Sequence, residues 1–167
     1  MNSPPARLLL LALLVVAPGV RALESDAQQP IDIRARSVEA NEKTGVSVYR
    51  GDVVMTQGSL RIEADRLEVT LRAGRVQLVR GWGEPARVRS RTDAGEELRG
   101  RGRRLEYRAQ PRELDLYGDV ELRRDGDVLT GAEAVHYSFA HRTFVARGGA
   151  ESQVHAVIQP APPAAGQ

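Results

Sequence analysis

The sequence has no cysteine, a single lysine (Lys43) and few aromatic residues, which make up 4% of the chain. Without cysteine the protein has neither disulfides nor thiolate metal ligands, and no lipid can be attached to an N-terminal Cys. No apolar run reaches the roughly 20 residues that a membrane-spanning helix needs. A disulfide scaffold, a zinc domain based on cysteine and a helical membrane protein are therefore not expected.

One shorter apolar run, from Leu8 to Val16, lies between Arg7 and Arg21 and is followed by small residues up to Ala22. This order predicts a secretory signal peptide over residues 1–22, cleaved after Ala22. The whole chain has 24 basic and 22 acidic residues, and two of the basic ones precede Ala22. The mature chain is therefore expected to be close to neutral, without the long-range field that draws in nucleic acid.

Apolar and polar residues alternate through most of the chain, as in Ile31 to Ala35, Leu60 to Ala64 and Leu114 to Leu116. Period two predicts strands with one buried and one solvated face. We therefore expect an all-β domain of many short antiparallel strands over residues 30–159. The polar residues 23–29 and the Pro-rich residues 160–167 are expected to be disordered.

Four segments align without gaps: Ile31 to Ala40, Leu60 to Val69, Leu98 to Tyr107 and Val128 to Tyr137. The second of these also fits a helix by its apolar spacing, but Gly100 and Gly102 within the third favour a strand. Inside each copy the alternation of apolar and polar residues shifts by one position, which predicts a bulge that bends the sheet. Polar turn signals separate the copies, and glycines such as Gly51 and Gly118 are expected to form corners before the strands that follow them.

Three apparent motifs have simpler interpretations. Lys43-Thr44-Gly45 is interpreted as a turn, because the S-x-x-K element of serine enzymes needs a second lysine. Gly81-Trp-Gly-Glu-Pro-Ala86 has dinucleotide-fingerprint spacing but is followed by alternating residues, where a helix is required. The histidines are not spaced like metal ligands. We expect no catalytic residues, no metal and no cofactor.

Arginine accounts for 23 of the 24 basic residues. Acidic residues flank the densest run, so we interpret the arginines as a solvated surface. Contact with phosphate groups of an anionic ligand is the alternative, because the guanidinium group suits bidentate binding.

The segment from Gly51 to Leu67, together with Gln29 to Ile33, Gly83 to Ala86, Leu105 to Tyr107 and Leu116 to Val120, resembles the periplasmic lipopolysaccharide-transport protein A (LptA, OstA-like) family. The resemblance implies an open, twisted β-jellyroll in the periplasm whose interior holds the acyl chains of lipopolysaccharide. It also implies LptC-like inner-membrane and LptD-like outer-membrane partners, and head-to-tail self-association through edge strands.

Ten inward positions are candidates for the acyl-chain trough. Ile31, Val88 and Tyr107 match family positions that face the lipid, and the rest follow from alternation; the alternative is that most of them only fill the core. The full set is Ile31, Ile33, Val53, Met55, Leu60, Ile62, Val88, Tyr107, Val120 and Leu122.

The leading hypothesis is thus a carrier and bridge without enzymatic activity, acting in outer-membrane assembly. The alternative is a self-associating structural module of the cell envelope that binds no lipid. A periplasmic hydrolase comes third, because no catalytic constellation stands out.

Overall fold

A computed structural model describes residues 29–92 and 95–159, and the predicted signal peptide and Pro-rich tail lie outside these residues. Within them ten strands form one antiparallel sheet, which confirms the all-β expectation. In this part of the chain no helix is long and apolar enough to cross a membrane. The strands are β1 (Ile31–Arg34), β2 (Ser37–Asn41), β3 (Val46–Gln57), β4 (Leu60–Arg72), β5 (Arg75–Arg91), β6 (Glu97–Arg108), β7 (Glu113–Arg124), β8 (Asp127–Ser138), β9 (Thr143–Gly148) and β10 (His155–Val157).

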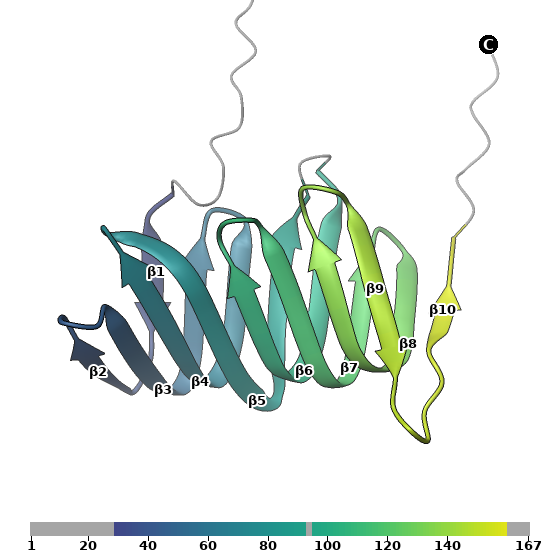
Figure 1. Cartoon of the computed structure of the whole chain (residues 1–167), viewed down its shortest axis with the longest axis horizontal. Helices are drawn as coiled ribbons and strands as arrows, with labels where there is room; N and C mark the ends of the chain where they lie inside the picture. The colour runs from purple at the N-terminus through teal and green to yellow at the C-terminus, as the bar shows by residue number, and fades with distance from the viewer. Residues whose placement is uncertain (1–28, 93–94, 160–167) are drawn as a thin grey trace, which may run out of the picture.

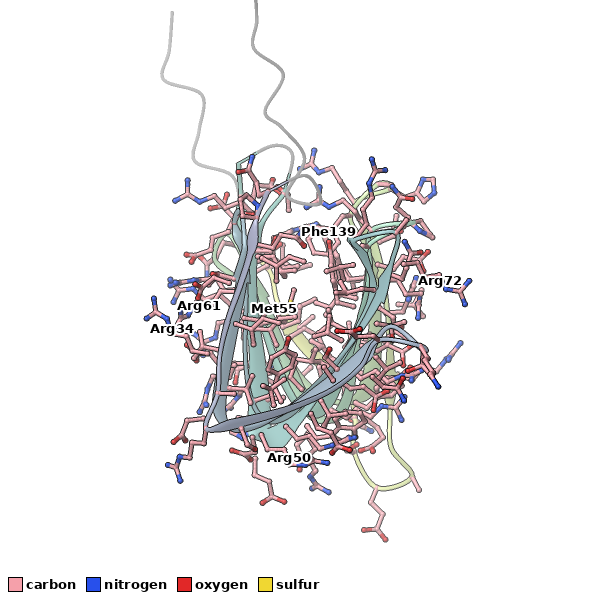
Figure 2. The ribbon with its side chains drawn as sticks, turned by 90° about the vertical axis from the view of Figure 1, so that its left-hand side faces the viewer. Arg34, Arg50, Met55, Arg61, Arg72 and Phe139 are labelled. Carbon is pink, nitrogen blue, oxygen red and sulfur yellow. The ribbon has the colours of Figure 1, made fainter. Side chains whose placement is uncertain are left out.

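The six long strands, β3 to β8, are each bent near the middle, so the sheet folds into two facing walls (Figures 1 and 2). We call wall A the half made of β1, β10 and residues 53–57, 60–64, 86–91, 97–102, 120–124 and 127–132. Wall B consists of β2, β9 and residues 46–50, 66–72, 75–82, 104–108, 113–117 and 134–138. The molecule is therefore an open, twisted β-jellyroll.

The bends lie where the shift in apolar alternation predicts them. The pairing register shifts between Glu63 and Arg66 in β4 and between Arg101 and Arg104 in β6, which is the middle of the second and third repeat copies. One expectation is corrected: Gly51 and Gly118 do not precede new strands but lie inside β3 and β7. A bulge turns the strand without ending its pairing, so each strand runs through both walls.

Two corners use the same backbone device. Gly51 and Gly118 have φ angles of 84° and 76°, and the aspartates that follow them also have positive φ. Each aspartate forms an ion pair with an arginine of the neighbouring segment, Asp52 with Arg36 and Asp119 with Arg103. A Cβ on Gly118 would lie 3.1 Å from the Arg103 side chain. The left-handed backbone and the close approach together require glycine here.

The first repeat copy is divided rather than bent. Its first half is β1, which pairs with β3 in wall A, and its second half is β2, which pairs with the other half of β3 in wall B. At the opposite end β9 and β10 both pair with β8, one in each wall. The sheet therefore has two free ends, β1/β2 and β9/β10 (Figure 1).

The hydrophobic core fills the space between the walls. Met55, at the centre of Figure 2, is completely buried, whereas the labelled arginines point outwards. The turn residues Phe139 and Arg112 lie at the rim, where the guanidinium group of Arg112 covers the Phe139 ring at 4.9 Å. The bent sheet thus encloses an apolar interior and presents charged faces to solvent.

Candidate functional site

All ten predicted trough residues face the interior. Eight of them have exposed fractions of 5% or less, and the two on β1, Ile31 and Ile33, are half-buried and pack against the same core. They come from wall A except for Tyr107, which lies in wall B. The structure therefore brings these residues together on one continuous apolar surface.

Wall B contributes interior residues that the sequence analysis did not single out. Leu67, Leu105, Leu116 and Tyr137 are each at most 1% exposed and face wall A. Leu67, Leu105 and Tyr137 follow the bulge in their strands, whereas Leu116 precedes the bulge in β7. On the two sides of a bulge, alternate positions of opposite parity point inwards. The eighth residue is apolar in all four aligned segments, and this recurrence is the sequence signal that could have identified Leu67 and Leu105.

The interior is filled by the protein's own side chains. Tyr107 and Tyr137 are the largest of these, and both rings contact Phe139 edge-on, with centroid distances of 6.4 and 4.9 Å. Such packing resembles an ordinary protein core. A ligand therefore finds space first at the ends of the trough.

An apolar opening lies at the β9/β10 end. This cavity of about 240 Å³ continues the interior outwards and is lined mainly by Leu122, Leu129, Tyr137, Phe144, Val157 and Ile158. Phe144 is 44% and Ile158 75% exposed, which is unusual for apolar side chains of this size. The opening includes Leu122, one of the ten predicted trough residues. We call it the C-terminal opening.

Tyr137 gives the C-terminal opening one unusual polar group. Its side chain is 1% exposed, and its hydroxyl is buried without a hydrogen-bond partner among the described residues. A buried hydroxyl without a partner costs roughly 1–3 kcal/mol. The hydroxyl can therefore donate a hydrogen bond to a polar atom of a ligand that enters here.

The opposite end also presents apolar residues. Ile31, Ile33 and Tyr49 are half-buried there, and Val38 on β2 is 60% exposed. The strands β1 and β2 have four and five residues and each pairs only with β3. This end therefore combines free backbone edges with apolar side chains, which suits pairing with another strand.

Outside the trough, wall B is covered by paired charges. Arg80 lies between Glu68 and Glu106, with nitrogen–oxygen distances of 3.4 and 3.2 Å. His136 Nδ1 lies 2.8 Å from Asp115 Oδ1, and Trp82 is covered by the guanidinium group of Arg66 at 4.4 Å. His136 is thus held on the outer surface, and His141 lies in the turn between β8 and β9. No cluster of three or more potential metal ligands occurs in residues 29–92 or 95–159.

An open β-jellyroll with an apolar interior and two free ends defines a class of proteins that enclose an elongated apolar ligand. The model of the LptA/(LptD N-terminal domain) LPS transport protein family matches residues 32–139. The chain belongs to this family.

The chain is also similar to individual lipopolysaccharide export proteins. The lipopolysaccharide export system protein LptH of Pseudomonas aeruginosa is 32% identical over 119 residues, covering 69% of this chain and 67% of that protein. The export protein LptA of Haemophilus influenzae is 27% identical over 158 residues, covering 92% and 91% of the two chains. LptA of Escherichia coli K12 is 29% identical over 122 residues, which is 59% of its length.

A solved structure has the same fold. It is the crystal structure of LptH, described as the LptA homologous periplasmic component of the lipopolysaccharide transport device of P. aeruginosa. It superposes with a TM-score of 0.73 at 28% identity and covers 82% of this chain and all of the LptH chain. The likeness extends over nearly all of the described sheet.

Proposed function

We propose that this protein is a periplasmic carrier of lipopolysaccharide that shields the acyl chains between its two walls and acts without enzymatic activity. The observation that carries the proposal is the C-terminal opening, where the apolar interior reaches the surface at Phe144 and Ile158. Each CH₂ group removed from water is worth about 0.8 kcal/mol. An acyl chain in the trough is thereby kept in water-free surroundings during transfer.

The ten predicted trough residues are the proposed path of the acyl chains. Ile31 and Ile33 lie at the β1/β2 end and Leu122 at the C-terminal opening, so the set extends from one end of the interior to the other. The packed middle has to move aside for a chain to pass. We propose that the two walls move apart at the interface between them, because no backbone hydrogen bonds have to break there.

The free ends support the proposed bridge. Docking the β1/β2 end of one copy against the β9/β10 end of another would extend the sheet and cover Val38, Phe144 and Val157, whose exposed fractions are 60%, 44% and 42%. The same strand addition would join LptC-like and LptD-like partners at the inner and outer membranes. Export through a signal peptide cleaved after Ala22 would place the protein in the periplasm.

A photo-crosslinking amino acid at Ile33 tests the carrier function in cells. Ile33 faces the trough, whereas its neighbour Asp32 has a side chain that is 63% exposed. We expect lipopolysaccharide adducts at Ile33 and none at Asp32. Equal labelling at both positions, or none at either in cells that make lipopolysaccharide, would contradict the proposal and favour a structural module without lipid.

A further inference from the structure

The outer face of wall A carries a row of arginines on four adjacent strands. Arg61 lies directly opposite Arg89, Arg89 opposite Arg99, and Arg99 opposite Arg123. Neighbouring strands are about 4.8 Å apart, so the row is about 14 Å long. Arg61 points outwards from this wall in Figure 2. Like charges directly opposite each other destabilise a sheet, so folding alone does not account for this row.

A second row lies beside the first and runs Glu63, Arg87, Arg101, Glu121. Arg87 and Arg101 face each other across β5 and β6, with a glutamate at either end of the row. Arg87 makes no ion pair with any side chain in the described part of the chain. Six arginines thus share this face, and we call them the arginine cluster: Arg61, Arg87, Arg89, Arg99, Arg101 and Arg123.

Three carboxylates compensate only half of this charge. Glu63 contacts Arg61 at 2.7 Å, Glu97 contacts Arg99 at 2.8 Å, and Glu121 bridges to Arg101 and Arg123. Hydrogen bonds from Arg99 and Arg123 lower the pKa values of Glu97 and Glu121 respectively, so both remain ionised at neutral pH. With six arginines against three glutamates, the face retains three positive charges.

Wall B shows that this arrangement is not a general property of the protein. Across the same strands one of its outer rows runs Glu68, Arg80, Glu106, so Arg80 faces a carboxylate on each side. Arg108 is likewise placed between Glu106 and Asp115, at 2.9 and 2.6 Å. Single pairs of facing arginines also occur in wall B, Arg50 opposite Arg66 and Arg72 opposite Arg75, but among the described residues only wall A has an unbroken row of arginines across four strands.

The arginine cluster surrounds a hollow of about 320 Å³. Val88 and Gly100 form its floor with their backbone, because the Val88 side chain is buried inside and a Cβ on Gly100 would lie 2.6 Å from Leu116 in the core. Guanidinium groups around a shallow hollow fit phosphate oxygens, to which arginine donates paired hydrogen bonds.

We propose that the arginine cluster is a binding site for phosphorylated ligands on the outer face of wall A. The hollow is wider than one phosphate group, so a ligand with two phosphates is expected to bind more tightly than one with a single phosphate. The phosphate can belong to a soluble ester or to the phosphorylated headgroup of a glycolipid; the chemistry of recognition is the same.

Isothermal titration with pyrophosphate in low-chloride buffer tests the site on the mature chain. The double substitution Arg89→Gln and Arg99→Gln is expected to weaken binding at least tenfold. The matched control, Arg72→Gln with Arg147→Gln, removes the same charge from exposed positions of wall B and is expected to change binding less than twofold. Equal loss in both variants, or no binding by the unaltered protein, would overturn the proposal. Thermal unfolding of each variant distinguishes lost binding from misfolding.

A second arm identifies the source of the phosphate. If the ligand is a glycolipid headgroup, the Arg89/Arg99 variant binds intact lipopolysaccharide at least threefold more weakly than the unaltered protein does. Both proteins then bind enzymatically dephosphorylated lipopolysaccharide equally well. If the ligand is soluble, only pyrophosphate binding falls. Failure of both arms refutes the phosphate site and leaves the crosslinking test at Ile33, and with it the carrier function, unaffected.

Discussion

Phe144 and Val145 are neighbours on β9 but face opposite sides of wall B. Phe144 lies opposite Tyr137 and lines the apolar C-terminal opening, whereas Val145 lies opposite His136 on the charged outer surface. One step along the strand thus separates the proposed lipid path from solvent. The relationship follows from the period of two in a strand, and it supplies matched pairs of positions for experiments.

Glycine at the corner of β7 is expected to be necessary for stability. Gly118→Ala places a side chain at a φ of 76° and 3.1 Å from Arg103, which strains the backbone and displaces the partner of Asp119. We expect a loss of about 1–2 kcal/mol in the free energy of unfolding, measured by urea denaturation. Gly74→Ala is the control, because its φ is 72° but no atom lies within 4 Å of the new Cβ. A larger loss at Gly74 would show that the corner contact is unimportant.

The hydroxyl of Tyr137 is expected to contribute nothing to the stability of the unliganded protein. Because this buried group has no partner among the described residues, Tyr137→Phe should leave the free energy of unfolding unchanged or raise it slightly. Tyr137→Leu removes the ring and its contact with Phe139 and should cost about 2–4 kcal/mol. Chemical denaturation of both variants measures the difference. A clear loss in Tyr137→Phe would mean that the hydroxyl is satisfied within the protein.

Arginines on the two walls are expected to respond in opposite ways to substitution. Arg89→Gln removes a charge that faces Arg61 and Arg99 and whose one carboxylate contact, to Glu97, is long at 3.9 Å, so at low ionic strength Tm should stay constant or rise. Arg80→Gln breaks contacts with Glu68 and Glu106 and should lower stability by about 0.5–1 kcal/mol. Raising the salt concentration should shrink both effects. A similar fall in Tm for both variants would show that the arginine row supports the fold.

Acid should weaken the protein partly through Glu121. A hydrogen bond from Arg123 lowers its pKa below 4.5 in the folded state. Its contribution is therefore complete above about pH 4.5 and is lost as the pH falls through the lower folded-state value. Glu121→Gln should reduce stability at pH 7 and flatten its decline between pH 5 and 3 in urea titrations, whereas Glu42→Gln in an exposed turn should not. An unchanged decline in Glu121→Gln would contradict this account.

Self-association is expected to depend on the β1/β2 end. Val38→Lys puts a charge on an edge strand at a side chain that is 60% exposed, and it should lower the apparent mass in sedimentation velocity at high concentration. Gln110→Lys adds the same charge in the turn between β6 and β7 and should leave association unchanged. If the two variants behave alike, association does not run through this end.

The strands, their turns and the bend in three of the four repeat copies could be predicted from the sequence, because period two, glycine spacing and the shift in alternation are local signals. The first copy is divided into β1 and β2 instead of bent. Alternation also placed Met55, Ile62 and Val120 correctly in the interior. It did not reveal that β3 and β7 continue through their corners. The bend in a strand depends on its pairing with the strands on both sides. The sequence of a single segment does not contain that information.

The arginine row could not be predicted from the sequence, for a different reason. Arg61, Arg89, Arg99 and Arg123 become neighbours only through the register of four strands, which the hairpins between them fix. In the sequence these residues appear merely as part of an arginine-rich composition. The same holds for the C-terminal opening, where Leu122 from β7 meets Val157 from β10.

The most direct test of the proposed carrier function uses single spin labels at Phe144 and Val145. The chain has no cysteine of its own, so Phe144→Cys and Val145→Cys each give one labelling site. On addition of lipopolysaccharide, electron paramagnetic resonance should show strong immobilisation of the label at Phe144 and little change at Val145. Equal spectra at both positions, with or without lipopolysaccharide, would contradict an acyl-chain path between the walls.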